Sequence, residues 1–228
     1  MSELELFNPR RHARLIFELA ADVYAWLTWL PEWRAHCASL VDYFPALERP
    51  LDVLDVGVGP GVSAIAIADR LPDARVVGLD FSQRMLTTAQ GYLERYSAAR
   101  QIHLLRADAA TLPLPDASFD VVTGHSFLYL LPQREQVVDE IARVLRPGGH
   151  CVFLEPGDGG DMLSWLKVPG SPKLKLCMGL WRVFSGRAGR FSETTLAQLL
   201  GRRLEHVEVS RTLEGLGLLG RARRKDHT

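Results

Sequence analysis

Hydrophobic residues change their spacing twice along the chain, and the changes divide its 228 residues into three zones. In residues 1–49 the apolar positions recur every three or four residues, which is the spacing of one face of a helix. This stripe consists of Leu15, Ile16, Leu19, Ala20, Val23, Leu27 and Leu30. The first zone is therefore predicted to be helical and to cover the rest of the protein as a cap or lid.

The second zone, residues 50–155, alternates short apolar runs with helical stretches. The runs predict strands at 51–56, 75–80, 102–106, 119–124 and 150–155, with helices at about 62–71, 82–97 and 133–145. Strands that are apolar along their whole length and are separated by helices are typical of a parallel sheet covered on both faces. The pattern predicts an α/β domain with a Rossmann-like, doubly wound sheet, extending over residues 50–228.

The third zone, residues 156–228, is less regular. It begins with an insertion to about residue 191 that reads as loop-rich, followed by a helix with Ser192 as its N-cap and Gly201 just past its end. Two further strands, 205–211 and 214–222, lie too close together for a helical crossover. We expect them to form an antiparallel hairpin at one edge, which brings the sheet to about seven strands.

Composition narrows the class of protein. Lys and Arg number 27 and so do Asp and Glu, so no net charge is available to hold nucleic acid. The three cysteines are widely spaced without a C-x-x-C pair, which favours free thiols in a reducing compartment, the cytoplasm, and neither disulfides nor a bound metal. We expect no secretory signal, and no apolar run reaches the ~20 residues that a bilayer span needs.

The stretch VLDVGVGPG joins the first strand to the first helix of the sheet and is the main candidate for ligand binding. Glycines at such a turn let a ligand approach the backbone and the free N–H groups of the helix. Gly59, Gly61 and Ala64 match the G-x-G-x-x-A string of dinucleotide sites, whereas Asp55, Gly57, Gly59 and Gly61 match D-x-G-x-G-x-G. A carboxylate repels a pyrophosphate but attracts the ammonium and sulfonium of S-adenosylmethionine, which favours the second ligand. The alternative is that Asp55 only caps the turn.

The next two strands also end near acids. Asp80 could accept both ribose hydroxyls of an adenosine, or it could cap the helix after Phe81. Asp108 could accept the exocyclic amine of adenine, with Phe81 and either Leu105 or Ala109 on the two faces of the ring. In the alternative, Asp108 is a turn residue in solvent.

Four segments in this order and spacing, VLDVGVGPG, VVGLDFSQRML, RADAATLPLPDASFDVV and VLRPGGHCVFLEPG, resemble the class I S-adenosylmethionine-dependent methyltransferases. The similarity is to the small-molecule branch that includes the ubiquinone/menaquinone-biosynthesis enzymes, and it covers about residues 50–156. The resemblance implies a seven-stranded sheet with an antiparallel last strand. It also implies that Asp55 and Gly57 to Gly61 hold the methionine part, Asp80 the ribose and Asp108 the adenine, with Tyr24 closing over the methionine part.

Candidates for the chemistry end the fourth and fifth predicted strands. His125 would lie beside the methyl donor, where it could act as a general base or only shape the pocket. Tyr129 is either a wall of the substrate pocket or part of the core. Glu155 should point into the same cleft and orient the substrate, or else bond the backbone of the 157–160 loop.

We therefore expect a methyltransferase that uses S-adenosylmethionine, releases S-adenosylhomocysteine and acts on a small, largely apolar acceptor: a quinone precursor, a lipid or an aromatic natural product. The 156–191 insertion mixes Trp, Leu and Phe with Lys and Arg. It could lie on an anionic membrane surface, cover a greasy substrate, or pack as a cap helix with a solvated basic face. A nicotinamide-dependent oxidoreductase and a non-catalytic subunit with the same fold are the competing functions. The sequence carries no signal for an oligomeric state.

Overall fold

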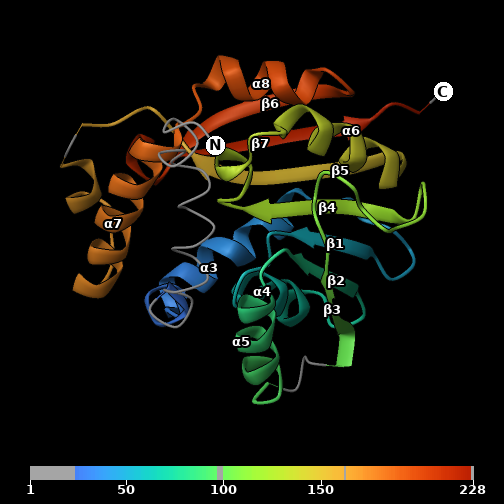
Figure 1. The fold of residues 1–228 in the computed structure, drawn as a ribbon, viewed down its shortest axis with the longest axis horizontal. Helices are drawn as coiled ribbons and strands as arrows, with labels where there is room; N and C mark the ends of the chain where they lie inside the picture. The colour runs from blue at the N-terminus through green and yellow to red at the C-terminus, as the bar shows by residue number, and fades with distance from the viewer. Residues whose placement is uncertain (1–23, 97–99, 162, 227–228) are drawn as a thin grey trace, which may run out of the picture.

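The computed structural model describes residues 24–96, 100–161 and 163–226 and places seven strands in one sheet (Figure 1). Their order is β3-β2-β1-β4-β5-β7-β6. The strands are β1 (Asp52–Val56), β2 (Arg75–Asp80), β3 (Ile102–Arg106), β4 (Phe119–His125), β5 (Leu145–Pro156), β6 (Leu204–Thr212) and β7 (Gly217–Arg224). β1 to β5 pair in parallel, and β7 runs antiparallel to both of its neighbours, β5 and β6. The predicted fold class, including the C-terminal hairpin at the sheet edge, is confirmed.

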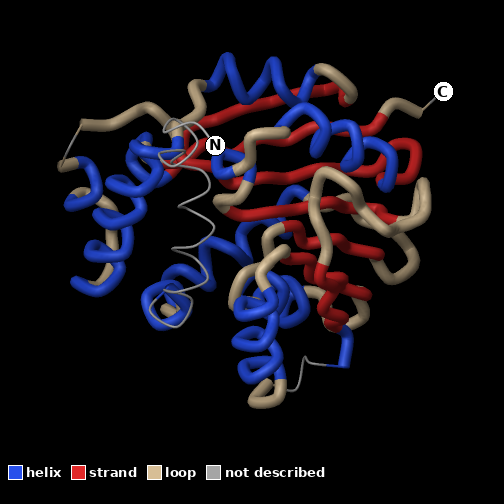
Figure 2. Tube along the Cα trace, viewed as in Figure 1, coloured by secondary structure: helices blue, strands red, loops and turns tan. Residues whose placement is uncertain are grey.

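Helices cover both faces of this sheet, as the alternation of side chains along β1 shows. Their bounds are α3 (Pro31–Ser39), α4 (Val62–Arg70), α5 (Gln83–Leu93), α6 (Arg134–Val144), α7 (Pro172–Ala188) and α8 (Glu193–Gly201). Leu54 and Val56 pack with buried residues of α6 and α8, whereas Val53 packs with those of α4 and α5. Successive side chains of a strand point to opposite faces, so the two sets of helices lie on opposite sides of the sheet. Figure 2 shows the strands of this sheet side by side across the molecule.

The strand order reverses direction between β1 and β4, which places the candidate site. From β1 the chain moves outward through α4 to β2 and through α5 to β3, and then returns to place β4 on the other side of β1. In open α/β sheets, ligands bind beyond the carboxyl ends of the strands at such a switch point. The arrowhead of β4 in Figure 1 points towards α3 and α7, so these two helices lie at the ligand-binding end of the sheet.

The insertion at 156–191 contains the cap helix that was one of its alternatives, although its pattern reads as loop-rich. The pattern predicts a loop-rich segment, but the structure has a short 3-10 helix, η4 (Ser164–Leu166), and the 17-residue α7. Ser171 caps α7 by accepting a hydrogen bond from the N–H of Leu174. Leu174, Cys177 and Met178 form its buried face. The helix escapes pattern analysis because apolar residues also occupy its outer face, which blurs the helical period.

Smaller differences concern the ends of elements. β5 begins at Leu145, five residues before the predicted strand, because Leu145 pairs with Phe119 of β4. Gly201 is the last residue of α8 and not the residue after it. The predicted stripe from Leu15 to Val23 lies outside the described residues. In the ranges that the structure describes, no helix is long and apolar enough to cross a bilayer.

Candidate cofactor and acceptor site

The turn after β1 has the backbone that its glycines predict. Gly57, Gly59 and Gly61 all adopt positive φ angles, of 73°, 51° and 86°. The N–H groups of Gly57 and Val58 both donate to the carbonyl of Leu79, at 2.8 and 3.0 Å, which fixes the turn against the end of β2. A Cβ atom on Gly57 would lie 2.6 Å from Cβ of Phe127, whereas one on Gly59 would meet no atom closer than 3.9 Å. Gly57 therefore serves packing, and Gly59 keeps the backbone accessible.

Asp55 is fully buried at the end of β1 and only half satisfied. Its Oδ2 accepts a hydrogen bond from the Ser63 hydroxyl on α4 at 2.5 Å, and its Oδ1 has no hydrogen-bond partner within the described ranges. Burial raises the pKa of Asp55 to about 7, the bond from Ser63 opposes that rise, and the charge of Asp80 adds to it. Its partner is a helix side chain and not the backbone of the turn, so Asp55 does not act as a turn cap. A buried carboxylate oxygen without a partner is suited to a cationic ligand group.

Asp80 joins the glycine turn to the start of α5. Its Oδ2 accepts the N–H of Gly59 at 2.9 Å, and its Oδ1 accepts the N–H of Ser82 at 2.8 Å. Ser82 itself caps α5 by accepting from the N–H of Met85, so Asp80 is not the cap of this helix. A carboxylate oxygen can accept two hydrogen bonds, and the geometry of Asp80 is compatible with the predicted binding of a ribose.

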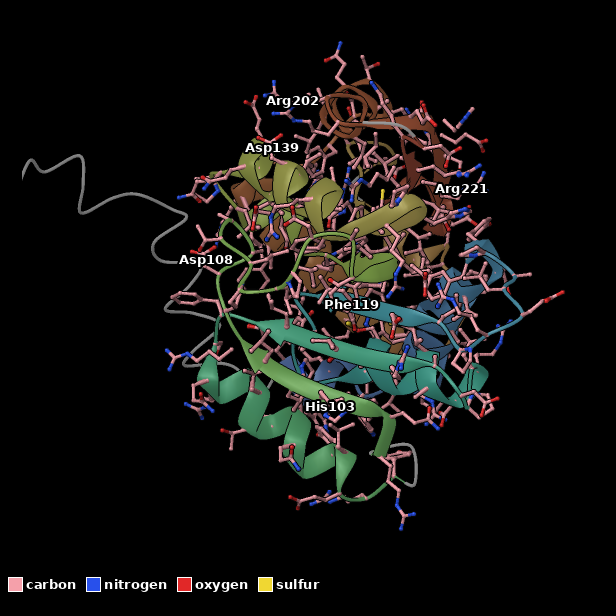
Figure 3. The ribbon with its side chains drawn as sticks, turned by 90° about the vertical axis from the view of Figure 1, so that its right-hand side faces the viewer. His103, Asp108, Phe119, Asp139, Arg202 and Arg221 are labelled. Carbon is pink, nitrogen blue, oxygen red and sulfur yellow. The ribbon has the colours of Figure 1, made fainter. Side chains whose placement is uncertain are left out.

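Asp108 lies on the loop that follows β3, whereas His103 lies near the start of this strand (Figure 3). Its Oδ1 accepts the N–H of Ala110 at 2.9 Å, as in an Asx turn. Since Asp80 pairs with Arg106 across β2 and β3, Asp108 stands just beyond the last pair of residues that these strands share. Phe81 is 46% exposed and Ala109 is half-buried. The structure thus brings the three predicted acids to the carboxyl ends of three neighbouring strands.

His125 ends β4, is buried, and contacts the aromatic ring of Trp33. Its Nδ1 lies 3.2 Å from the Ser126 hydroxyl, and its Nε2 is buried without a hydrogen-bond partner in the part of the chain that the structure describes. Burial lowers the pKa of His125 to about 3, with a contribution from His36, so the imidazole is neutral at physiological pH. Its ring meets Trp33 of α3 edge to face at 4.7 Å, and Trp33 meets Trp181 of α7 in the same way at 6.2 Å.

Two tyrosines lie at the same end of the sheet. Cε1 of Tyr24 is 3.9 Å from the place that a Cβ on Gly59 would occupy, which sets this side chain over the glycine turn. Burial raises the pKa of Tyr24, and the nearby Tyr129 of η3 (Leu128–Leu130) and Cys177 of α7 raise it further. Tyr129 is itself buried, and burial together with the nearby Glu155 raises its pKa.

Glu155 has a role that differs from both expectations. It is fully buried, its Oε1 accepts the N–H groups of Phe127 and Leu128, and its Oε2 accepts the N–H of Tyr129, all at 3.0–3.1 Å. Burial raises its pKa to about 7, while these three bonds act in the opposite direction. Glu155 thus holds the turn after β4 in place and neither bonds the 157–160 loop nor turns a free oxygen towards a substrate.

Two further residues belong to this region, and the sequence analysis missed the role of Arg182. Arg182 of α7 donates to the carbonyls of Gly157 and Gly160, at 3.2 and 2.8 Å, and so takes the place that Glu155 was expected to have at that loop. Trp33 forms the aromatic contact with His125. The density of tryptophan in the first zone was a signal for Trp33, but no local pattern indicates Arg182, because its partners lie more than 20 residues away.

These residues fit S-adenosylmethionine better than a dinucleotide. The unpartnered Oδ1 of Asp55 and the open backbone at Gly59 are compatible with the cationic methionine part, and Asp80 and Asp108 are hydrogen-bond acceptors at the ends of the two neighbouring strands. A pyrophosphate at this turn would meet the buried carboxyl of Asp55. In the described ranges no group of His, Cys, Asp and Glu could hold a metal ion. The fold and the site therefore define an adenosyl-binding protein with a Rossmann-like sheet.

Comparisons with known proteins identify the family. The family model described as methyltransferase domain matches residues 53–149. The demethylmenaquinone methyltransferase of Thermus thermophilus is 38% identical over 124 residues, 54% of this chain and 53% of that protein. The enzyme of the same name from Lysinibacillus sphaericus is 34% identical over 166 residues, 72% of this chain and 67% of that protein. The chain belongs to the class I S-adenosylmethionine-dependent methyltransferase family, as the sequence predicted.

A solved structure supports the fold. Phosphoethanolamine N-methyltransferase 2 of Haemonchus contortus, bound to phosphomonomethylethanolamine and S-adenosylhomocysteine, superposes with a TM-score of 0.69 at 16% identity, over 92% of this chain and 58% of that chain. The chain spans about half the length of the curated relatives it matches.

Proposed function

We propose that the protein transfers a methyl group from S-adenosylmethionine to a small, largely apolar acceptor and releases S-adenosylhomocysteine. The observation that carries this proposal is the buried, unpartnered Oδ1 of Asp55 beside the open backbone of Gly59. Three free and buried cysteines, Cys37, Cys151 and Cys177, suit a reducing compartment, and we place the activity in the cytoplasm.

When bound, S-adenosylmethionine supplies a methyl group on a positively charged sulfur, which is already a good leaving group. The protein then has mainly to position the reactants and exclude water. Asp55 offers its unpartnered oxygen to the cationic methionine part, and Asp80 offers both carboxylate oxygens to the ribose. Tyr24 covers the glycine turn, and its neutral phenol adds no negative charge there.

The acceptor belongs beside His125. Its aromatic neighbour Trp33, which in turn contacts Trp181, would favour a flat, apolar molecule. The neutral imidazole has an unpartnered Nε2, which can accept a hydrogen bond from a hydroxyl of the acceptor and so orient it. Because the pKa of His125 is low, Nε2 takes this proton only as attack by the oxygen or ring carbon on the methyl group makes the hydroxyl strongly acidic. The names of the relatives from Thermus thermophilus and Lysinibacillus sphaericus point to a quinone as this acceptor.

Calorimetric titration tests the cofactor. S-adenosylhomocysteine should bind to the wild type, and at least tenfold more weakly to Asp80→Ala. The control Asp73→Ala removes an exposed acid before β2 and should bind the ligand with unchanged affinity. Absence of binding to the wild type, or equal binding to Asp80→Ala, would refute the adenosyl site. NAD should produce no heat of binding, and the oxidoreductase would gain support if it did.

A methyl-transfer assay tests His125. With a labelled methyl donor and a reduced naphthoquinone as the acceptor, His125→Gln should lower kcat about a hundredfold while the affinity for S-adenosylhomocysteine changes less than twofold. If turnover is unchanged, His125 only shapes the pocket. If the wild type binds cofactor but methylates no quinol, lipid or phenol, the protein is a non-catalytic member of its family.

A further inference from the structure

α7 presents large apolar side chains to the outside as well as to the core. Leu176, Val183 and Phe184 are 51%, 49% and 44% exposed, and their spacing of seven and eight residues places them on one side of the helix. Figure 1 shows α7 at the periphery of the molecule, beyond the end of the sheet. The side facing the protein is fully occupied by Leu174 and Met178, so the outer side chains are not needed for the core.

Further exposed apolar residues surround this helix. Leu163 directly precedes η4 and Leu166 is its last residue; they are 59% and 44% exposed. This short helix packs on α7 through the ring of Trp165, which would approach a Cβ on Gly179 to 3.3 Å. Trp26, 57% exposed, lies under the ammonium of Lys173 at 4.0 Å. The residues that form this outer apolar face are Trp26, Leu163, Leu166, Leu176, Val183 and Phe184. Monomeric soluble proteins rarely gather such side chains in one place without a partner.

The charges of the same segment are mostly of one sign, although Lys167 pairs with Asp161, which directly precedes the segment, at 3.5 Å. Residues 162–192 contain Lys167, Lys173, Lys175, Arg182, Arg187 and Arg190, six cations in all, and no acid, although the whole chain has 27 of each. Arg182 and Arg190 turn towards backbone carbonyls of the protein. Lys173, Lys175 and Arg187 remain on the helix surface, where Lys173 and Lys175 are half-buried and Arg187 is exposed.

This combination identifies one kind of partner. Apolar side chains bordered by cations can enter the acyl boundary of a bilayer while the cations meet phosphates. We propose that the outer apolar face of α7 and η4 binds the surface of anionic lipid bilayers. An acidic protein would satisfy the cations, but it would leave no reason for six uncharged and mainly aliphatic side chains.

The position of α7 connects membrane binding with the proposed function. Its inner side carries Trp181, which contacts Trp33 and through it His125. The same helix therefore contributes to the lipid-facing surface and to the acceptor site. An apolar acceptor dissolved in the bilayer could reach the site from that surface. This part of the argument rests on the proposed methyltransferase function, whereas binding to lipid can be measured without cofactor or acceptor.

The test uses co-sedimentation of the full chain with vesicles. Vesicles of phosphatidylcholine containing about one third phosphatidylglycerol should bind the wild type, pure phosphatidylcholine should bind it much more weakly, and high salt should release it. The double variant Val183→Ser/Phe184→Ser should lose at least tenfold in binding. The double variant Lys175→Glu/Arg187→Glu should lose more than tenfold, because each surface cation contributes about fivefold.

Two control variants change the same kinds of residue elsewhere. Leu47→Ser removes an exposed leucine before β1, and Lys225→Glu removes a cation after β7. Both should bind vesicles like the wild type, and all variants should keep the wild-type affinity for S-adenosylhomocysteine, which separates a failure here from a failure of the cofactor site. Absence of wild-type binding to anionic vesicles, or equal binding by the Val183/Phe184 variant, would overturn the proposal. A dimer that this variant abolishes would instead make the face an interface between two copies.

Discussion

Replacement of Asp55 by asparagine should make the protein more stable and unable to bind its cofactor. Asp55 is fully buried, and its pKa of about 7 lies well above the value of 3.8 for an exposed aspartate. The folded protein therefore disfavours the ionised carboxylate that a cationic ligand needs. Asparagine has nearly the same shape and can still accept the hydrogen bond from Ser63, but it carries no charge.

The magnitude follows from the difference in pKa between the folded and unfolded states. A folded pKa above the unfolded one means that stability is full below pH 3.8 and is lost as pH rises towards 7. At about 1.4 kcal/mol per pH unit, the wild type loses about 4 kcal/mol of unfolding free energy over this window. The asparagine side chain of Asp55→Asn does not ionise, so the variant should gain on the wild type between pH 4 and 7 and keep a constant advantage at higher pH.

Urea denaturation from pH 4 to 9, with and without S-adenosylhomocysteine, measures both effects. Ligand at about 100 times its dissociation constant should stabilise the wild type by about 2.7 kcal/mol and leave Asp55→Asn unchanged. The affinity of the wild type should also fall about tenfold between pH 8 and pH 6, because the fraction of ionised Asp55 falls by that factor around a pKa of 7. A variant that is less stable than the wild type at pH 8, or that binds the ligand equally well, would refute this reasoning.

Four further variants test other parts of the structure. Gly57→Ala should have a much lower melting temperature, because its Cβ would lie 2.6 Å from that of Phe127. Gly59→Ala should cost only about 1–2 kcal/mol of backbone strain, and yet it should weaken S-adenosylhomocysteine binding at least tenfold in calorimetry. Equal melting temperatures of the two variants would contradict this contrast. Asp120 is bonded to two arginines, which lower its pKa to about 2 although burial acts in the opposite direction. Asp120→Asn should therefore lose about 2 kcal/mol of unfolding free energy at pH 7, and this loss should shrink as pH falls from 4 to 2. A loss that is independent of pH in urea titrations would rule out this ionic cause. Glu155→Ala should lower the unfolding free energy by at least about 1–3 kcal/mol in urea titrations, because three backbone N–H groups lose their acceptor, and an unchanged stability would speak against that role.

Strand positions and the acids at strand ends could be predicted because they depend on local patterns. The bounds of β2 and β3 agree with the prediction, and Asp55, Asp80 and Asp108 lie at the ends of neighbouring strands as expected. The binding roles of these residues remain predictions. An apolar run indicates that a strand is buried on both faces, and a polar residue that ends such a run lies near the end of that strand.

The partners of buried polar groups could not be predicted in this way. Glu155 is bonded to residues 26 to 28 positions earlier in the chain, and Arg182 to residues 22 and 25 positions away. Each looked like an ordinary charged residue at the end of a strand or within a basic segment. Only the folded chain shows that the first holds the turn after β4 and the second holds the loop after β5.

The sequence by itself determined the α/β class, the positions of the strands and the family, because hydrophobic period and glycine spacing act over a few residues at a time. The tertiary structure decided which buried groups were left without a partner among the described residues, such as Oδ1 of Asp55 and Nε2 of His125, and which face of α7 remained exposed. The physical reason is that burial and hydrogen bonding depend on what the rest of the chain brings to a residue. Residue type and local spacing contain no record of those distant neighbours.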